Sequence, residues 1–382
     1  MGIEFKASQR SSLGIEMELE IVDARTRELA SAGSHLLKLM GRGHPEGVHP
    51  KAKHELFEST VEIITGICSD VAEARADLQA TLTELTAHAE EHGLAVLCSG
   101  SHPFSHWVAQ EISPNPRYHK LVGEMQWLAR RLQIFGIHVH VGVRSAEKAI
   151  AIANALTTYI PHLLALSASS PYWLGKDTGL ASCRSKVFES LPTAGLPHRL
   201  ADWREFEELM GTLRRSKAIA SIREIWWDIR PHPDFGTVEL RICDGLPRLT
   251  EVASVAALSQ CLVDWMDDRY DRGLDLPVPK AWVLRENKWK AARYGMEAEI
   301  IVDELGALRP IRSAVAGLVE ELAPVGRRLG CEKELLRTLE VVDEGPSYVR
   351  QRAVVAAGGS LVDVVDAMVQ ELRTDCPVRQ GR

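Results

Sequence analysis

The segment from Leu13 to Val22 alternates between apolar and acidic side chains, with glutamates at positions 16, 18 and 20. Successive side chains of a β-strand point to opposite faces, so this period of two predicts a strand with one apolar and one acidic face. Like charges on one face repel one another unless water or a bound cation relieves the repulsion. A solvent-exposed strand face therefore explains this segment as well as a metal site does.

Three further predicted strands repeat the arrangement. Their polar faces carry Glu58, Thr60 and Glu62 in residues 55–65, His138 and His140 in residues 134–143, and Glu239 and Arg241 in residues 237–243. Taken singly, the histidines could be hydrogen-bonded in a core or cleft, and Glu239 and Arg241 could form a surface ion pair. Four such strands together favour a metal site instead.

The ligand types point to a hard divalent cation. Carboxylate oxygens with an occasional imidazole suit Mg²⁺ and Mn²⁺, which bridge nucleotide phosphates during phosphoryl transfer. Zinc is less expected, because no cysteine stands at a zinc-site spacing. Arg184, Arg230 and Arg241 lie near predicted chain reversals beside these strands, and guanidinium groups bind carboxylate and phosphate. Each arginine alone could be structural, but their clustering indicates a substrate role.

Strands predominate early in the chain and helices late. Predicted helices cover residues 34–43, 70–92 with Ser69 as N-cap, 117–133, 145–167 with a kink at Pro161, 184–191 and 202–217, and only helices follow Thr250. The pattern predicts an α+β fold, with one curved, mainly antiparallel sheet and helices on its outer face. We expect a single catalytic domain over residues 1–382, with a sheet-forming core at about 13–275 and a helical C-terminal region at about 280–375.

Composition narrows the functional classes. The net charge of -7 and a pI near 6.1 argue against a nucleic-acid-binding face. The seven cysteines show no regular spacing, the N-terminus lacks an apolar signal core, and no apolar run reaches membrane-spanning length. We therefore expect a cytoplasmic protein with reduced thiols that binds neither nucleic acid nor membrane. The sequence contains no Walker A loop, Rossmann glycine motif or GxSxG elbow.

Seven ordered motifs resemble one family. They are GIEMELEIVD, ELFESTVEIITG, GSHPF, GIHVHVGV, PHLLALSASSPYWLGKDTGLASCRS, WWDIRPHPDFGTVELRICD and WKAARYG. Together they resemble the carboxylate–amine ligase family that is related to the second type of glutamate–cysteine ligase and has a glutamine-synthetase-like catalytic sheet. The resemblance extends from Gly14 to about Gly295. The family often has three consecutive acidic residues where this chain has Glu16-Met17-Glu18, but Met17 lies on the apolar face of the predicted strand.

The resemblance implies an ATP- and Mg²⁺-dependent reaction in two steps, with Mn²⁺ as a substitute ion. ATP phosphorylates a carboxylate to an acyl phosphate, and an amine then displaces the phosphate to give an amide. Glu16, Glu18, Glu62 and Glu239 would hold the ions, and whether Glu58 is a ligand or supports one stays open. His138 would lie on the metal or phosphate side, and His140 would contact nucleotide. Arg184 and Arg241, with Arg230 as a weaker candidate, would bind the transferred phosphoryl group or the substrate carboxylate.

The default substrates are L-glutamate and L-cysteine, which give γ-glutamylcysteine, although the amine could be another amino acid or a polyamine. Two alternatives remain: a phosphotransferase on the same sheet, and a nucleotide-binding regulator without ligase activity. The resemblance also predicts a homodimer.

Overall fold

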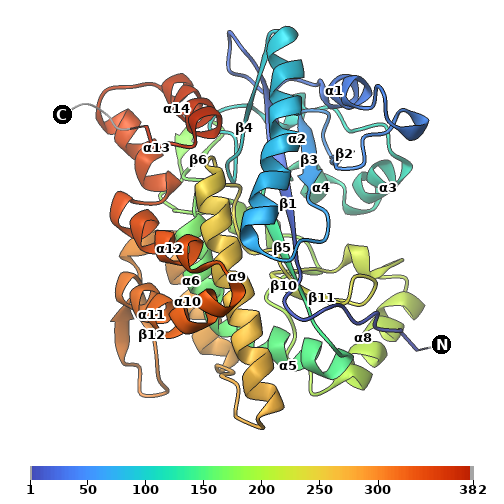
Figure 1. The fold of residues 1–382 in the computed structure, drawn as a ribbon. Coiled ribbons are helices and arrows are strands. Elements are labelled where there is room, and N and C mark those ends of the chain that lie inside the picture. Colours follow the sequence, from blue (N-terminus) through green and yellow to red (C-terminus); the bar gives the residue numbers. More distant parts are fainter. Residues whose placement is uncertain (1, 379–382) are drawn as a thin grey trace.

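The computed structural model describes residues 2–378. Its centre is a seven-stranded antiparallel sheet (Figure 1). Six strands follow one another in the order β10 (Ile229–His232), β11 (Thr237–Leu240), β5 (Ile137–Gly142), β1 (Leu13–Asp23), β3 (Thr60–Ile64) and β2 (Ala52–His54). The seventh, β4 (Leu94–Leu97), pairs with the last residues of β1, beyond the segment that pairs with β5. The long strand β1 therefore joins both halves of the sheet.

One face of this sheet is the core of the molecule. The apolar residues of β1, β3, β5 and β11 point to it, and Met17, Val61 and Val139 are completely buried. Helices α2 (Val71–Glu91), α5 (Ala146–Leu156) and α9 (Leu249–Asp271) pack against this face, and Figure 1 shows α2 and α9 side by side over it. Burial of one Leu, Ile or Val side chain contributes about 1.5–3 kcal/mol to the stability of the fold. The apolar side chains on this face therefore determine which face of the sheet packs against the helices.

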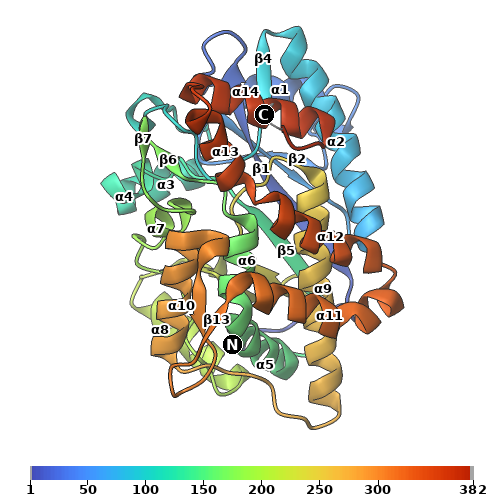
Figure 2. The same cartoon turned by 90° about the vertical axis from the view of Figure 1, so that its left-hand side faces the viewer.

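The C-terminal part is mainly helical, and two of its helices pack on α9 (Figure 2). Its helices are α10 (Ala281–Tyr294), α11 (Ile311–Leu329), α12 (Glu332–Glu344), α13 (Ser347–Ala356) and α14 (Leu361–Thr374). The prediction of helices only after Thr250 is wrong, because β12 (Glu299–Ile301) and β13 (Leu308–Pro310) form a hairpin. Each strand has three residues, too few to show a period of two, and the Asp303 side chain accepts hydrogen bonds from Leu305 and Ala307 in the loop.

The remaining elements are shorter. The helices are α1 (Gly33–Met40), α3 (Pro116–Met125), α4 (Trp127–Arg130), α6 (Ile160–Ser167), α7 (Arg184–Phe188) and α8 (Trp203–Arg215). Two small strand pairs are β6 (Tyr172–Trp173) with β7 (Lys176–Asp177), and β8 (Ala194–Gly195) with β9 (Trp226–Trp227). Single turns of 3₁₀ helix are η1 (Pro45–Gly47), η2 (Trp107–Ala109), η3 (Thr157–Tyr159), η4 (Ile222–Glu224) and η5 (Gly295–Glu297).

Two predicted helices are interrupted. The predicted helix over 117–133 breaks at Gln126, whose φ of 49° is incompatible with a right-handed helix. The predicted break near Pro161 is confirmed, because η3 separates α5 from α6 and Pro161 lies in the first turn of α6.

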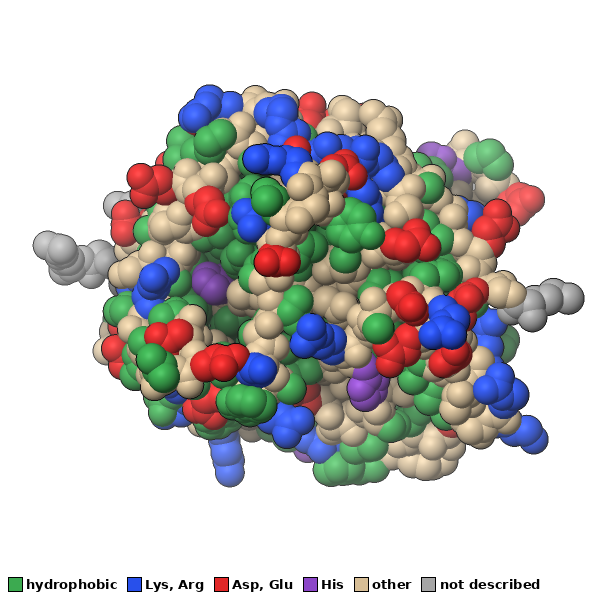
Figure 3. Space-filling model, turned by 90° about the horizontal axis from the view of Figure 1, so that it is seen from below, with side chains coloured by type: hydrophobic (Ala, Val, Ile, Leu, Met, Phe, Trp, Pro, Cys, Tyr) green, Lys and Arg blue, Asp and Glu red, His purple; other side chains and the backbone are tan. Residues whose placement is uncertain are grey.

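Two features bear on whether the protein associates with a membrane or with nucleic acid: an apolar helical stretch and the distribution of surface charge. The stretch Ala146–Ser167 is long and apolar enough to cross a membrane, but 78% of its apolar 18-residue window is buried inside the fold. It therefore behaves as a core helix. On the face seen in Figure 3, acidic and basic side chains are interspersed, so the net charge is not concentrated there.

Candidate active site

The polar face of the sheet lines a cavity of about 880 Å³. Its ionisable wall residues include Glu16, Glu18, Glu55, Glu62, His138, His140, Arg184, Arg230, Glu239 and Arg241. These side chains come from β1, β3, β5, β10 and β11, together with α7 and two loops. The pleat places them together, since residues two apart on a strand share a face and neighbouring strands run in register. With the exception of Glu58, the structure brings every sequence-predicted site residue to this cavity.

Glu16 lies between the two histidines of β5. His138 Nδ1 is 2.9 Å from Glu16 Oε2, and His140 Nε2 is 3.5 Å from Glu16 Oε1. Burial alone would raise the pKa of Glu16, but its contacts with His138 and His140 bring that pKa well below its usual value. Burial, aided by the charge of Arg241, lowers the pKa of His138 to about 4. Glu16 is therefore an ionised carboxylate beside a neutral imidazole at neutral pH.

Glu239 lies between two arginines. Arg230 Nη2 is 2.6 Å from Glu239 Oε2, and Arg241 Nη1 donates to Glu239 Oε1. Burial opposes ionisation of Glu239, but the two guanidinium charges lower its pKa below the usual range. Arg230 Nη1 also donates to the carbonyls of Ile222 and Ile225. Because most of its donors are used by protein acceptors, the geometry gives Arg230 the role of orienting Glu239.

Arg184 reaches the cavity from the start of α7. Its two Nη atoms donate to the carbonyls of Ile242 and Arg241 at 3.3 Å each, and its Nε has no partner among the described residues. This approach depends on Gly136, since a Cβ there would lie 2.2 Å from Arg184 Nη2. The glycine before the HVH motif thus leaves room for an arginine.

Glu18 and Glu62 form the second acidic group of the cavity. Glu18 is opposite Glu62 in the β1–β3 pairing, and Glu18 Oε2 accepts a hydrogen bond from the backbone N–H of Gly136. Burial raises the pKa of Glu62 well above its usual value, and the nearby charges of Glu16 and Glu55 raise it further. The nearest opposite charge is that of the half-exposed Lys53, whose Nζ is 3.6 Å from Glu62 Oε2, and it only partly offsets this rise.

Glu55 is a site residue that the sequence did not single out. Burial, with the charge of Glu18, raises the pKa of Glu55 to about 7. The predicted strand over 55–65 begins only at Thr60, so Glu55 lies in the preceding loop. Loop residues follow no periodicity, and no local pattern distinguishes Glu55 from Glu58.

Two expected members of the acidic face lie elsewhere. The expectation that Glu58 shares a strand face with Glu62 is wrong, because Glu58 precedes β3 and its carboxylate accepts hydrogen bonds from the Ser34 N–H and hydroxyl at the start of α1. Glu20 points to the predicted side, but the Ser99 hydroxyl donates to it at 2.6 Å and burial raises its pKa to about 8. Neither carboxylate is among the described residues that line the cavity.

The donor set fits hard divalent cations. The ligand atoms of Glu16, Glu62 and His138 lie within 4.8 Å of one another, as do those of Glu16, His140 and Glu239. His140 Nε2 is buried and has no hydrogen-bond partner among the described residues. Carboxylate oxygens with a minority of imidazole nitrogens are the ligands of Mg²⁺ and Mn²⁺ sites.

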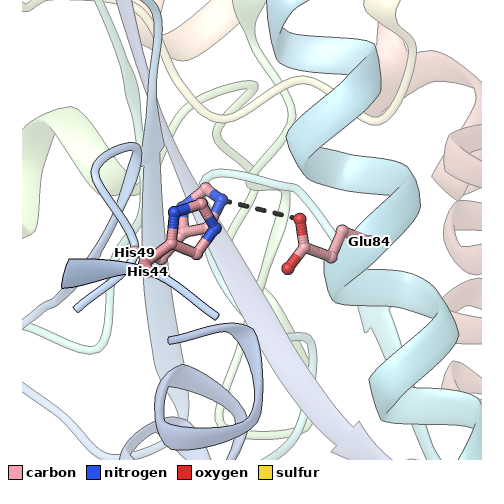
Figure 4. Close-up of side chains that lie close together, drawn as sticks. All are labelled: His44, His49 and Glu84. Atoms are coloured by element: carbon pink, nitrogen blue, oxygen red, sulfur yellow. Dashed lines mark ion pairs between the residues drawn. The ribbon is translucent and has the colours of Figure 1, made fainter. Parts of the chain in front are cut away.

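A third group of possible ligands, His44, His49 and Glu84, lies where the loop after α1 faces α2 (Figure 4). His49 Nε2 is 3.5 Å from Glu84 Oε2, and His49 Nδ1 accepts a hydrogen bond from the Lys51 N–H. A neutral His49 then carries its proton on Nε2, the nitrogen that faces Glu84. This tautomer suits a hydrogen bond to Glu84 rather than a metal ion.

Comparisons with known proteins identify the family of this chain. The model of the family described as glutamate-cysteine ligase family 2 matches residues 12–367. A Frankia casuarinae protein named "Putative glutamate--cysteine ligase 2-1" is 58% identical over 382 residues, which cover 100% of both chains. The similarly named Thermobifida fusca protein is 50% identical over 99% of this chain and 94% of its own.

Among solved structures, a glutamate–cysteine ligase from Francisella tularensis, in complex with AMP, has a TM-score of 0.68 at 14% identity. The match covers 97% of this chain and 90% of that one, so it supports the expected ligase-type fold. The family inferred from the seven motifs is confirmed: the chain belongs to glutamate–cysteine ligase family 2.

Proposed function

We propose that this chain is an ATP-dependent ligase that joins a carboxylate to an amine through an acyl phosphate, with L-glutamate and L-cysteine as default substrates. One observation carries the proposal: a single cavity holds five carboxylates and the two imidazoles of β5 beside Arg184 and Arg241. Phosphoryl transfer depends on positioning and on positive charges around the phosphate rather than on a nucleophile supplied by the protein.

The carboxylates divide into two candidate ion sites. Glu16, Glu62 and His138 form one, Glu16, His140 and Glu239 form the other, and Glu18 and Glu55 line the same cavity. Bound Mg²⁺ supplies charge neutralisation between the phosphate oxygens. The AMP in the Francisella tularensis structure supports an adenine nucleotide as the ligand of this fold. Mn²⁺ shares the preference for oxygen ligands and should replace Mg²⁺.

The arginines supply the remaining positive charge. In the first step, a substrate carboxylate oxygen bonds to the γ-phosphorus of ATP and the bond to the ADP oxygen breaks. Arg184 and Arg241 are placed to bind the transferred phosphoryl oxygens, and Glu239 holds Arg241 in position. In the second step, the amine nitrogen bonds to the acyl carbon, phosphate leaves, and the proton of the amine passes to that phosphate.

A second arginine pair lies on another wall of the cavity. Arg117 Nη2 donates to the carbonyl of Arg223 at 3.5 Å, both side chains are exposed, and both line the cavity. The default substrate L-glutamate has a second carboxylate that does not react, and guanidinium groups are suited to bind this carboxylate. We propose this wall as the binding side for the acidic substrate.

The test is a product analysis. Wild-type protein, Glu239→Gln and the exposed control Glu286→Gln are incubated with MgATP, L-glutamate and a panel of amines, and ADP and the amide are measured by mass spectrometry. We expect wild-type and Glu286→Gln to form ADP and amide in equal amounts, and Glu239→Gln to form neither above background. ADP that forms without amide would identify a phosphotransferase, and ATP binding without ADP would identify a regulator. Either outcome would overturn the proposal.

The expected cytoplasmic location and the homodimer remain our proposals. Light scattering during gel filtration tests the latter, with a mass near twice 42.3 kDa as the expected result and a mass of one chain as the contradicting one.

A further inference from the structure

The cavity has two different ends along the strand direction. Beyond Glu18 on β1, the next residue on the same face is Glu20, which does not line the cavity and accepts a hydrogen bond from the Ser99 hydroxyl. In the opposite direction, β10 and β11 run to the turn that joins them, and His232 and Phe235 of this hairpin still line the cavity. A ligand longer than the phosphate site must therefore extend toward that turn or toward the wall that carries Arg117.

The turn presents a flat aromatic surface. The rings of His232 and Phe235 stack with centroids 4.2 Å apart and an interplanar angle of 7°. His232 covers one face of the phenyl ring, yet Phe235 is still 52% exposed. An exposed large aromatic side chain at the edge of a charged cavity contributes little to the core, but it offers a π-face to a nucleobase.

The chain fixes this turn in place. The Lys6 N–H donates to the carbonyl of Pro233 at 2.9 Å, and the Ser8 hydroxyl donates to the carbonyl of Phe235 at 2.6 Å. Gly236 has a φ of 64°, and a Cβ there would lie 1.8 Å from the Lys6 carbonyl oxygen. The N-terminal segment thus holds the aromatic pair before any ligand binds, which reduces the entropy cost of binding.

The spacing between the aromatic pair and the carboxylates suits a nucleotide. The ring centroids of Phe235 and His140 are 5.6 Å apart, and His140 Nε2 is 3.7 Å from Glu239 Oε1. Along β11, Glu239 is two positions beyond Thr237, so their Cα atoms are roughly 7 Å apart. A base stacked at the turn would leave the sugar near His140 and the phosphates at the carboxylates.

The two directions in which a ligand can extend differ in charge. The wall with Arg117 and Arg223 is cationic and suits the acidic substrate, whereas the hairpin turn offers a hydrophobic ring. We propose that Phe235, backed by His232, is the stacking platform for the adenine base of ATP. This assignment rests on the proposed ATP-dependent function and adds the position of the base.

Calorimetric titration of two ligands tests the assignment. MgATP carries the base, and Mg²⁺ with inorganic tripolyphosphate carries the same chain of phosphates without it. Base stacking on an aromatic side chain accounts for about tenfold to a hundredfold in affinity. We expect Phe235→Ala to weaken MgATP binding by that factor and to leave tripolyphosphate binding unchanged, while Phe235→Tyr binds both ligands as the wild type does.

The matched control is Trp282→Ala, which removes an aromatic side chain that is 69% exposed and does not line the cavity. It should bind both ligands as the wild type does. Unchanged MgATP binding by Phe235→Ala overturns the base assignment and leaves the proposed function intact. Equal weakening of both ligands also overturns it, because the ring would then act on the cavity as a whole. A wild-type protein that binds neither ligand contradicts the proposed function itself.

Discussion

Glu18 and Glu62 are directly opposite each other across the antiparallel strands β1 and β3. Directly opposed like charges destabilise a sheet, and burial increases that cost. The pKa of Glu62 is correspondingly raised well above its usual value. A sequence selected only for stability would not keep this pair. Under the proposed function, a bound cation near these carboxylates would relieve the repulsion, so the metal-free protein should be less stable than the ion-bound one.

Glu62→Gln should separate the cost of Glu62 to stability from its contribution to ion binding. Because the folded-state pKa of Glu62 lies above its unfolded value, its penalty is absent below the unfolded pKa and grows as pH rises toward the folded pKa. We expect the metal-free variant to melt higher than wild type at pH 8, with a smaller difference at pH 5. The variant should also lose most of the stabilisation that added Mg²⁺ gives the wild type.

Glu20→Gln is the matched control for this experiment. Burial raises the pKa of Glu20 to about 8, but its carboxylate lies outside the cavity and bonds to Ser99. The control should keep the full increase in melting temperature on addition of Mg²⁺. If Glu62→Gln keeps it too, Glu62 is not a metal ligand.

Gly136→Ala should remove activity without unfolding the protein. The added methyl group would lie 2.2 Å from Arg184 Nη2 and 3.0 Å from the Cys243 carbonyl oxygen, so the guanidinium group must move. Loss of one positioned phosphoryl-binding group lowers kcat on the order of a hundredfold or more. ADP-release kinetics with circular dichroism measure both effects. Gly123→Ala, which has open space around the new methyl, is the control and should keep wild-type kcat.

His162→Leu should change the pH dependence of stability. Burial, with the charge of Arg309, lowers the pKa of His162 to about 4, and no described residue accepts from or donates to its buried Nδ1. Since the unfolded chain binds a proton near pH 6.5 and the folded chain does not, His162 costs stability as pH falls from about 6.5 to 4. Removal of an unpartnered buried imidazole should therefore make unfolding less sensitive to acid in that window.

Urea unfolding at pH 7.5 and pH 5 measures this change. The control His102→Leu removes an imidazole that is also buried but bonds to the Arg27 carbonyl and the Ser105 N–H. Because burial also lowers the pKa of His102, to about 3, its removal likewise relieves a cost that grows as pH falls below about 6.5, but it also breaks two hydrogen bonds. We therefore expect this control to lose about 1–3 kcal/mol at pH 7.5 and less at pH 5, whereas His162→Leu has no hydrogen bond at Nδ1 to lose. An unchanged difference between pH 7.5 and pH 5 in His162→Leu would contradict the assignment.

The sequence predicted the parts of this structure that repeat with a short period. The alternation in β1 and the HVH motif identified four of the wall residues, Glu16, Glu18, His138 and His140, because strand geometry alone places such side chains on one face. Residues held by tertiary contacts were harder to predict. Glu55 lies in a loop, and the role of Arg230 follows from the carbonyls of Ile222 and Ile225, which local sequence does not place beside it.

Predictions that depended on local rules satisfied by several neighbouring residues were also wrong. Ser69 and Asp70 are both good N-cap residues, and the structure uses Asp70, whose side chain accepts from the Glu73 N–H. The break at Gln126 has no glycine or proline to signal it. In both cases several residues satisfy the local rule, and the packing of the rest of the chain decides among them.

The central claim is that the acidic face of the sheet binds divalent cations for phosphoryl transfer. Electron paramagnetic resonance of a Mn²⁺ titration tests it most directly, because protein-bound Mn²⁺ loses the sharp signal of the free ion. We predict saturable binding by the wild type, competition by Mg²⁺, and strongly weakened binding by Glu16→Gln, whose carboxylate belongs to both ligand groups in the cavity. A wild-type signal equal to that of free Mn²⁺, or full binding by Glu16→Gln, would contradict the account.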